Sequence, residues 1–128
     1  MEELNIAATR NTPAVHYQAH PARFTVSGNS IPENAGNFYR PIMEWIARNG
    51  AGLPADCTFE FNLPYFNSSS LKALYLLLME IKNAMQDRKE HRIAWYVEEE
   101  DEFMQEAADT FAELTGMHIE VCHGAPKA

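Results

Sequence analysis

The chain is poor in the residues on which several classes of protein depend. It has only two cysteines, Cys57 and Cys122, among 128 residues, which is too few for the disulfide framework of a small secreted domain. We expect both to be reduced and buried in strands. The chain also lacks an apolar run long enough for a membrane-spanning helix, and its first ten residues do not have the pattern of a signal peptide. These absences predict a cytoplasmic protein with no membrane segment.

Positive charge is scarce as well. Ten Lys and Arg residues stand against 18 Asp and Glu, so the formal net charge is −8 and the isoelectric point is about 5.0. Proteins that bind nucleic acid or anionic membrane surfaces use Lys and Arg to neutralise phosphates, so the charge balance argues against both partners. The length predicts a single domain over residues 1–128, and the apolar fraction of 46% is ordinary for a globular protein.

Hydrophobic periodicity predicts an α/β fold. Alternating or β-branched stretches indicate five strands, at residues 13–17, 23–27, 57–63, 92–97 and 117–122. Stretches with helical spacing indicate three helices, at residues 35–49, 69–86 and 101–114. The order is β-β-α-β-α-β-α-β, which favours a mixed sheet whose later strands are parallel, with right-handed crossovers. Residues 1–12 and 123–128 are expected to be loosely ordered.

The apolar residues of the last two helices are expected to face the core. In the second helix the apolar stripe begins at Leu71 and continues through Leu74 and Leu78. In the third helix the expected inward residues are Phe103, Ala107, Phe111 and Leu114. In the first helix, Asn34 is a candidate N-cap, and Pro41 is expected either in the first turns or at a kink.

Three consecutive serines, Ser68, Ser69 and Ser70, fall where the long second helix should begin. Free N–H groups and the positive end of the helix dipole gather at such a position, and a serine there is most often only a cap. The alternative is an exposed hydroxyl that accepts a phosphate. Tyr65 and Phe66 favour it, because they place aromatic rings at the edge where strands of an α/β sheet end, and binding sites occur there. A phosphate would add about −1.5 to −2 charges, which a helix start tolerates, so it would alter binding rather than unfold the domain.

Other candidate sites are weaker. The acidic run at residues 98–102 is expected to be solvated at the start of the third helix, with contact to a basic partner as the lesser alternative. His118, Cys122 and His123 do not form a closed metal site, because about 13 Å of strand separates His118 from Cys122. No catalytic Ser-His-Asp order, phosphate-binding glycine loop or dinucleotide fingerprint is present. We therefore expect no metal, no cofactor and no enzymatic activity.

Three separated motifs resemble those of a known family. They are NSIPEN at residues 29–34, YFNSSS at residues 65–70, and the pair Trp95-Tyr96 leading into an acidic helix. In this order they are similar to SiaC, a family of bacterial phosphoprotein regulators, over residues 4–121. The resemblance implies a fold like that of the anti-sigma-factor antagonist (STAS) domain.

The resemblance also implies a mechanism. SiaC-like proteins are phosphorylated at the start of the helix after the central strand by a serine/threonine kinase of the anti-sigma-factor-kinase type. A PP2C-type phosphatase removes the phosphate, and the unphosphorylated form activates a diguanylate cyclase, which favours biofilm. The modified position falls on Ser68, where the best-known members carry threonine, and Ser69 is a rival acceptor.

Together these arguments predict a non-catalytic regulator with Ser68 as its phosphorylation switch. Two alternatives are a partner-switching regulator with another effector and, in a different class, a small enzyme whose catalyst is an acidic residue or a histidine. A third is a structural subunit without a switch. The residues expected to contact a partner are Tyr65, Phe66, Asn67, Ser68, Ser69, Ser70, Pro32, Glu33 and Asn34.

Overall fold

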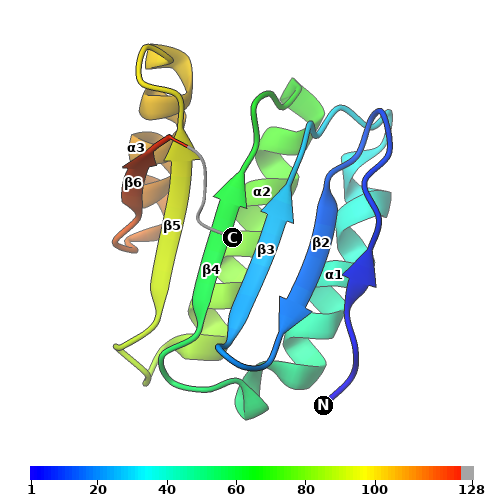
Figure 1. Cartoon of the computed structure of the whole chain (residues 1–128), viewed down its shortest axis with the longest axis vertical. Helices are drawn as coiled ribbons and strands as arrows, with labels where there is room; N and C mark the ends of the chain where they lie inside the picture. The colour runs from blue at the N-terminus through cyan, green and yellow to red at the C-terminus, as the bar shows by residue number, and fades with distance from the viewer. Residues whose placement is uncertain (125–128) are drawn as a thin grey trace.

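The computed structural model describes residues 1–124, in which six strands form one sheet and three helices cover it (Figure 1). The strands are β1 (Asn5–Ile6), β2 (Ala14–Gln18), β3 (Arg23–Ser27), β4 (Thr58–Asn62), β5 (Arg92–Val97) and β6 (Glu120–His123). The helices are α1 (Ala35–Asn49), α2 (Ser68–Met85) and α3 (Glu102–Thr115), and a short 3-10 turn, η1 (Gly50–Gly52), follows α1. The predicted α/β class and mixed sheet are confirmed.

The spatial order of the strands is their order in the sequence. The first two pairings, β1 with β2 and β2 with β3, are antiparallel, whereas β3, β4, β5 and β6 run parallel to one another. Each parallel pair is joined through a helix. Because such crossovers are right-handed and the strand order never reverses, all three helices lie on the same face of the sheet (Figure 1). The opposite face carries no helix among the described residues.

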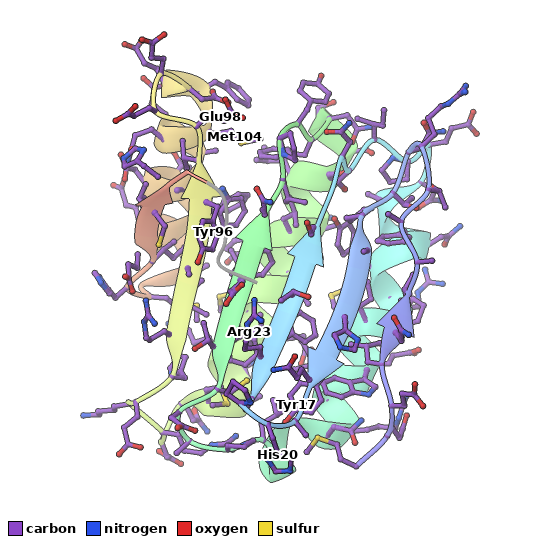
Figure 2. The ribbon with its side chains drawn as sticks, in the orientation of Figure 1. Tyr17, His20, Arg23, Tyr96, Glu98 and Met104 are labelled. Atoms are coloured by element: carbon purple, nitrogen blue, oxygen red, sulfur yellow. The ribbon has the colours of Figure 1, made fainter. Side chains whose placement is uncertain are left out.

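Strand alternation sorts the side chains between these two faces. Phe59 and Phe61 of β4 point toward the helices and are fully buried. Trp95 of β5 stacks on Phe61 with ring centroids 5.0 Å apart. The helix-free face instead carries polar groups, including the ion pair between Arg23 and Glu60 at 2.8 Å; Figure 2 shows Arg23 and Tyr96 on this face.

Side-chain caps begin each helix. Asn34 caps α1, Asn67 caps α2 and Asp101 caps α3, and each side-chain oxygen accepts a hydrogen bond from the backbone N–H three residues later. The predicted cap at Asn34 is confirmed, and α1 continues through Pro41. Helix α3 ends at Gly116, whose φ of 72° is in the left-handed region that glycine adopts without strain.

The N-terminal segment is more structured than the sequence indicated. Residues 5 and 6 form an edge strand against β2, Leu4 is buried, and its carbonyl accepts a hydrogen bond from the backbone N–H of Tyr17 at 3.0 Å. Glu2 pairs with Arg48 at 2.9 Å. The expectation of a loosely held arm over residues 1–12 missed these contacts, because a two-residue strand has no periodic pattern. At the other end, His123 closes β6, and the expectation for residues 125–128 falls outside the described residues.

The predicted buried faces of the last two helices are partly wrong. Phe103 and Leu114 are 60% and 61% exposed, and Leu71 is 47% exposed. In α3 the buried residues are Met104, Ala108, Phe111 and Thr115. This stripe and the predicted one share Phe111, and both have helical spacing, so periodicity alone does not say which of them faces the sheet.

Candidate functional site

The three serines occupy three different environments. Ser68 is the first residue of α2 and is exposed, and within residues 1–124 its hydroxyl makes no hydrogen bond. Ser69 is exposed too, but its hydroxyl donates to the Pro32 carbonyl at 3.3 Å or to Asn67 Oδ1 at 3.1 Å. Ser70 is fully buried. Only the Ser68 hydroxyl is therefore both accessible and unengaged.

Ser70 belongs to a buried hydrogen-bond chain beneath the loop. Its Oγ donates to the carbonyl of Ser30 or to Asn67 Oδ1, both at 2.9 Å, and lies 2.8 Å from the Oγ of Ser30. The Oγ of Ser30 lies 2.7 Å from the hydroxyl of Tyr39. A carbonyl or amide oxygen can only accept, so the Ser70 hydroxyl must donate to one of these oxygens. Ser30 therefore donates to Ser70, and Tyr39 donates to Ser30. Burial raises the pKa of Tyr39 to about 12, so its phenol stays protonated and able to donate.

Backbone hydrogen bonds fix the same loop. The N–H of Ser30 donates to the carbonyl of Tyr65, and the N–H of Asn67 donates to the carbonyl of Ser30, both at 3.0 Å. These bonds form an isolated parallel bridge between Ser30 and Phe66. The NSIPEN and YFNSSS motifs, which begin 36 residues apart in the sequence, therefore meet at this bridge. These bonds hold the loop that presents Ser68 at the carboxyl end of β4.

The NSIPEN motif supports the loop more than it faces solvent. Pro32 is buried, and its carbonyl accepts from the side-chain amide of Asn67 at 3.1 Å. Asn34 is exposed, but its side-chain oxygen accepts the N–H of Asn37 in the cap of α1. Glu33 is exposed and makes no side-chain hydrogen bond within residues 1–124. Of this motif, Glu33 has the side chain most available to a partner.

Burial also divides the predicted residues of the YFNSSS motif. Ser70 is fully buried, and Phe66 is only 4% exposed. Both side chains support the loop from below, and direct contact of either with a partner stays a prediction. Tyr65 is 54% exposed, and Ser68 and Ser69 are exposed beside it.

An apolar hollow of about 350 Å³ adjoins Ser68. Its lining comes from the loop, from the first turns of α2 and from the start of α3: Tyr65, Phe66, Asn67, Ser68, Leu71 and Phe103. Phe103 leans over Phe66 with ring centroids 6.0 Å apart. Large apolar side chains that are exposed together mark interaction surfaces more often than scattered ones do. We call Tyr65, Leu71 and Phe103 the apolar rim.

Sequence reasoning missed Leu71 and Phe103 as surface residues. Both were assigned to the core because their spacing suits a buried stripe. The available signal was an ambiguity in α3, where Phe103 and Met104 are adjacent and only one can face the sheet. The structure gives that place to Met104, which is 2% exposed.

A larger hollow of about 590 Å³ lies where β4 and β5 end; Figure 2 places Tyr96, Glu98 and Met104 there. Its lining includes the carboxylates of Glu98, Glu99 and Asp101 and the imidazole of His123, and within the described residues it shares no lining residue with the hollow at Ser68. The carboxylate of Asp101 accepts the N–H of Met104 as the cap of α3. Among the described residues, the lining of this hollow has carboxylates but no serine, threonine or cysteine side chain.

The acidic run contributes directly to this end of the molecule. Glu98, Glu99 and Glu100 are exposed, and Glu102 is exposed in the first turn of α3. Negative charge at a helix start is stabilising, which explains the run without any partner. The same carboxylates are also the charged neighbours of Phe103 along the chain. Across residues 1–124, no helix combines the length and the apolar character that crossing a bilayer requires.

Comparisons with known proteins agree with one another. Residues 6–123 match the model of a family described as SiaC family regulatory phosphoprotein. An uncharacterized protein of Pseudomonas aeruginosa strain UCBPP-PA14 is 28% identical over 113 residues, which cover 88% of this chain and 90% of that protein. The structure of SiaC of Pseudomonas aeruginosa superimposes with a TM-score of 0.82 at 25% identity, covering 97% of this chain and all of that one. The same TM-score and identity are found for a crystal structure of the diguanylate cyclase SiaD in complex with its activator SiaC from Pseudomonas aeruginosa, with 95% of this chain and all of the matched chain covered.

Proposed function

Because the chain belongs to the SiaC family of regulatory phosphoproteins, we propose that it binds and activates a diguanylate cyclase and that phosphorylation of Ser68 switches this binding off. The observation that carries the proposal is the position of Ser68. Its hydroxyl is exposed, is free of hydrogen bonds within residues 1–124, and lines the apolar hollow.

The local structure supports Ser68 as the acceptor over its neighbours. A kinase acting on Ser69 would have to break the hydrogen bonds of that hydroxyl to Pro32 or Asn67. Ser70 would have to leave the core. Ser68 needs no such rearrangement, so we propose its hydroxyl as the one that the kinase phosphorylates.

A phosphate on Ser68 is compatible with the fold. The N–H groups of the first helical turn have no intrahelical partners, and the helix dipole favours negative charge there by roughly 0.3–1 kcal/mol. Lys72 is exposed one turn later, in the i to i+4 arrangement that favours an acidic group followed by a basic one. Phosphorylation should therefore leave the stability of the domain nearly unchanged or slightly raise it.

The same phosphate is incompatible with docking on an apolar surface. The unmodified rim offers Tyr65, Leu71 and Phe103 around a small neutral hydroxyl. A partner that covers this hollow with apolar side chains would have to desolvate a dianion after phosphorylation, at a cost of several kcal/mol. The acidic run beside Phe103 adds a preference for a partner with basic side chains. The matching surface on the cyclase would be apolar at its centre and positively charged at its edge.

Two enzymes complete the proposed cycle. A serine/threonine kinase of the anti-sigma-factor-kinase type would add the phosphate, and a PP2C-type phosphatase would remove it. Their support is the family membership and the accessible hydroxyl. The chain itself would serve as a binding protein and not as an enzyme.

The test measures binding and cyclase output with defined forms of the protein. Phosphoserine is installed at residue 68 during translation, and the affinity of this form for a diguanylate cyclase of the same organism is compared with that of the unmodified chain. We expect the unmodified chain to bind and to raise cyclic di-GMP synthesis. We expect phosphoserine at residue 68 to weaken binding by at least about 100-fold, since several kcal/mol are lost.

Matched variants separate the site from its surroundings. Ser68→Ala should bind like the unmodified chain but resist the kinase, whereas Ser69→Ala should bind and still be phosphorylated. Phe103→Ser should weaken binding without phosphorylation. Equal affinity of the unmodified and phosphorylated chains would reject the switch. Binding that changes with phosphorylation but involves an effector other than a cyclase would keep the switch and replace the partner.

A further inference from the structure

A third hollow lies at the opposite end of α2 from Ser68. It has a volume of about 360 Å³ and is formed by the last turns of α2, the start of β5 and the connection between α3 and β6. An α-helix rises 1.5 Å per residue, so Lys82, the first lining residue along α2, lies roughly 21 Å from Ser68. It is therefore independent of the proposed docking surface.

The lining of this hollow is basic, although the protein is strongly acidic. Three of the ten Lys and Arg residues, Lys82, Lys89 and Arg92, line it, and among residues 1–124 Glu120 supplies the one lining carboxylate. His118 is exposed at its edge. The chain as a whole has a net charge of −8, so the charge of this hollow has the opposite sign to that of the whole protein.

The Glu120 carboxylate is neutralised by an ion pair inside the hollow. Arg92 binds the Glu120 carboxylate through two nitrogens at 2.8–3.0 Å. This bidentate pair satisfies the carboxylate, so it does not repel an incoming anion as a free carboxylate would. The two lysines remain as the net positive charge of the hollow.

Both lysines keep donors for a ligand. The ammonium of Lys82 donates to the Thr115 carbonyl at 2.6 Å, which uses one of its three N–H donors. Lys89 makes no hydrogen bond within residues 1–124, and it is exposed.

The floor of the hollow is apolar. Ile93 is 2% exposed, and Met117 is half-buried beside it. Ligand sites combine an apolar floor with a few placed polar groups, and they have volumes of roughly 300–1,000 Å³. At the low end of that range, the hollow suits a small molecule rather than a helix or a lipid chain.

We propose that this hollow binds a small amphiphilic anion, that is, a phosphate or carboxylate carried on a planar apolar ring. The anion would lie between Lys82 and Lys89, and the ring would cover Ile93 and Met117. We call this hollow the lysine pocket. The proposal does not depend on the switch at Ser68.

The experiment titrates the full chain with four probes and follows backbone amides by NMR. The probes are adenosine monophosphate, benzoate, adenosine without the phosphate, and inorganic phosphate without a ring. We expect saturable binding of adenosine monophosphate or benzoate in the millimolar range or tighter, with the largest shifts at Ile93, Met117 and His118. Whichever of these two binds tighter identifies the anionic group. Adenosine and inorganic phosphate should each bind at least tenfold more weakly.

Charge-removing variants decide whether the lysines bind the ligand. Lys89→Gln should weaken binding about fivefold to tenfold, as expected for a lost charge-assisted hydrogen bond. Lys82→Gln should do the same and is accompanied by a melting curve, because it also removes the bond to Thr115. The matched control is Lys72→Gln, which makes the same change on an exposed part of α2 outside the pocket. No saturable binding by either anion, or an equal loss in Lys72→Gln and Lys89→Gln, would overturn the proposal; Ser68→Ala should bind the probes like the unmodified chain.

Discussion

Replacement of Ser30 by alanine tests whether the buried hydrogen-bond chain beneath the loop that presents Ser68 stabilises the fold. Ser30 is fully buried and stands between Tyr39 and Ser70 in that chain. Ser30→Ala removes the only acceptor that the Tyr39 hydroxyl has within residues 1–124. Ser70 keeps two acceptors, the Ser30 carbonyl and Asn67 Oδ1, so the main cost falls on the phenol.

The magnitude follows from leaving one buried hydroxyl without a partner. That loss costs about 1–3 kcal/mol, a large part of the 5–15 kcal/mol by which a domain is usually stable. With a denaturant dependence of about 1–3 kcal/mol per molar urea, the unfolding midpoint should fall by roughly 1 M. The fluorescence of the buried Trp45 and Trp95 reports the transition.

A second substitution separates the orphaned phenol from other effects. Tyr39→Phe removes the hydroxyl that Ser30→Ala leaves unpaired. The double variant should therefore be more stable than the sum of the two single losses predicts, by at least about 0.5 kcal/mol. Ser27→Ala, an exposed serine at the end of β3, is the control and should stay within about 0.5 kcal/mol of the unmodified chain. The reasoning fails if Ser30→Ala is as stable as Ser27→Ala, or if the two losses simply add.

Three further substitutions or conditions test the packing and the titration of the fold. Phe103→Ser should change the free energy of unfolding by less than about 0.5 kcal/mol, because Phe103 is exposed. Phe111→Ala, on the buried side of the same helix, should lower it by about 3–5 kcal/mol. Similar urea midpoints for the two variants would contradict the assignment of the helix faces. Gly116→Ala should destabilise by about 1–2 kcal/mol, because alanine is strained at a φ of 72°, and an unchanged melting temperature would count against the left-handed cap. Burial raises the pKa of Cys57 from 9.0 to about 12 and that of Tyr39 from 10.0 to about 12. The contributions of these two groups to stability are therefore complete below about pH 9 and are lost as the pH rises toward 12. The urea midpoint should be lower at pH 10.5 than at pH 8, and this decrease should be smaller in Tyr39→Phe. Equal midpoints at both pH values would refute this.

The sequence carries enough information to predict most of the elements. Strands β3 and β5 and helix α1 have the predicted limits, because their apolar patterns end at clear turn residues such as Gly28 and Asn49. Limits shift where a cap decides them: α2 begins at Ser68 rather than residue 69, since Asn67 is the cap. The last strand, predicted at residues 117–122, occupies Glu120–His123. Likeness to the STAS domain stays a prediction.

The candidate site was less predictable than the fold. The motif placed the serines at a helix start, but only the three-dimensional contacts distinguish them: Ser69 and Ser70 are engaged, and Ser68 is not. The meeting of Ser30 with Phe66 joins segments that have no pattern in common. The rotation of α3 about its axis depends on packing against Phe66 and the sheet, which periodicity does not specify. For this reason the exposure of Phe103 could not be foreseen.

The firm anchoring of the loop has a consequence for how a signal would pass through this protein. Hydrogen bonds to Ser30 and Pro32 hold Asn67, just before Ser68, and the buried Ser70 hydroxyl, just after it, also donates to Ser30. A group added to Ser68 would therefore change the chemistry of one exposed position without requiring the loop to move. The proposed phosphate at Ser68 would need no relay through the interior to alter binding. The speed of the response would then be set by the kinase and the phosphatase, and the change in binding would last until the phosphate is removed.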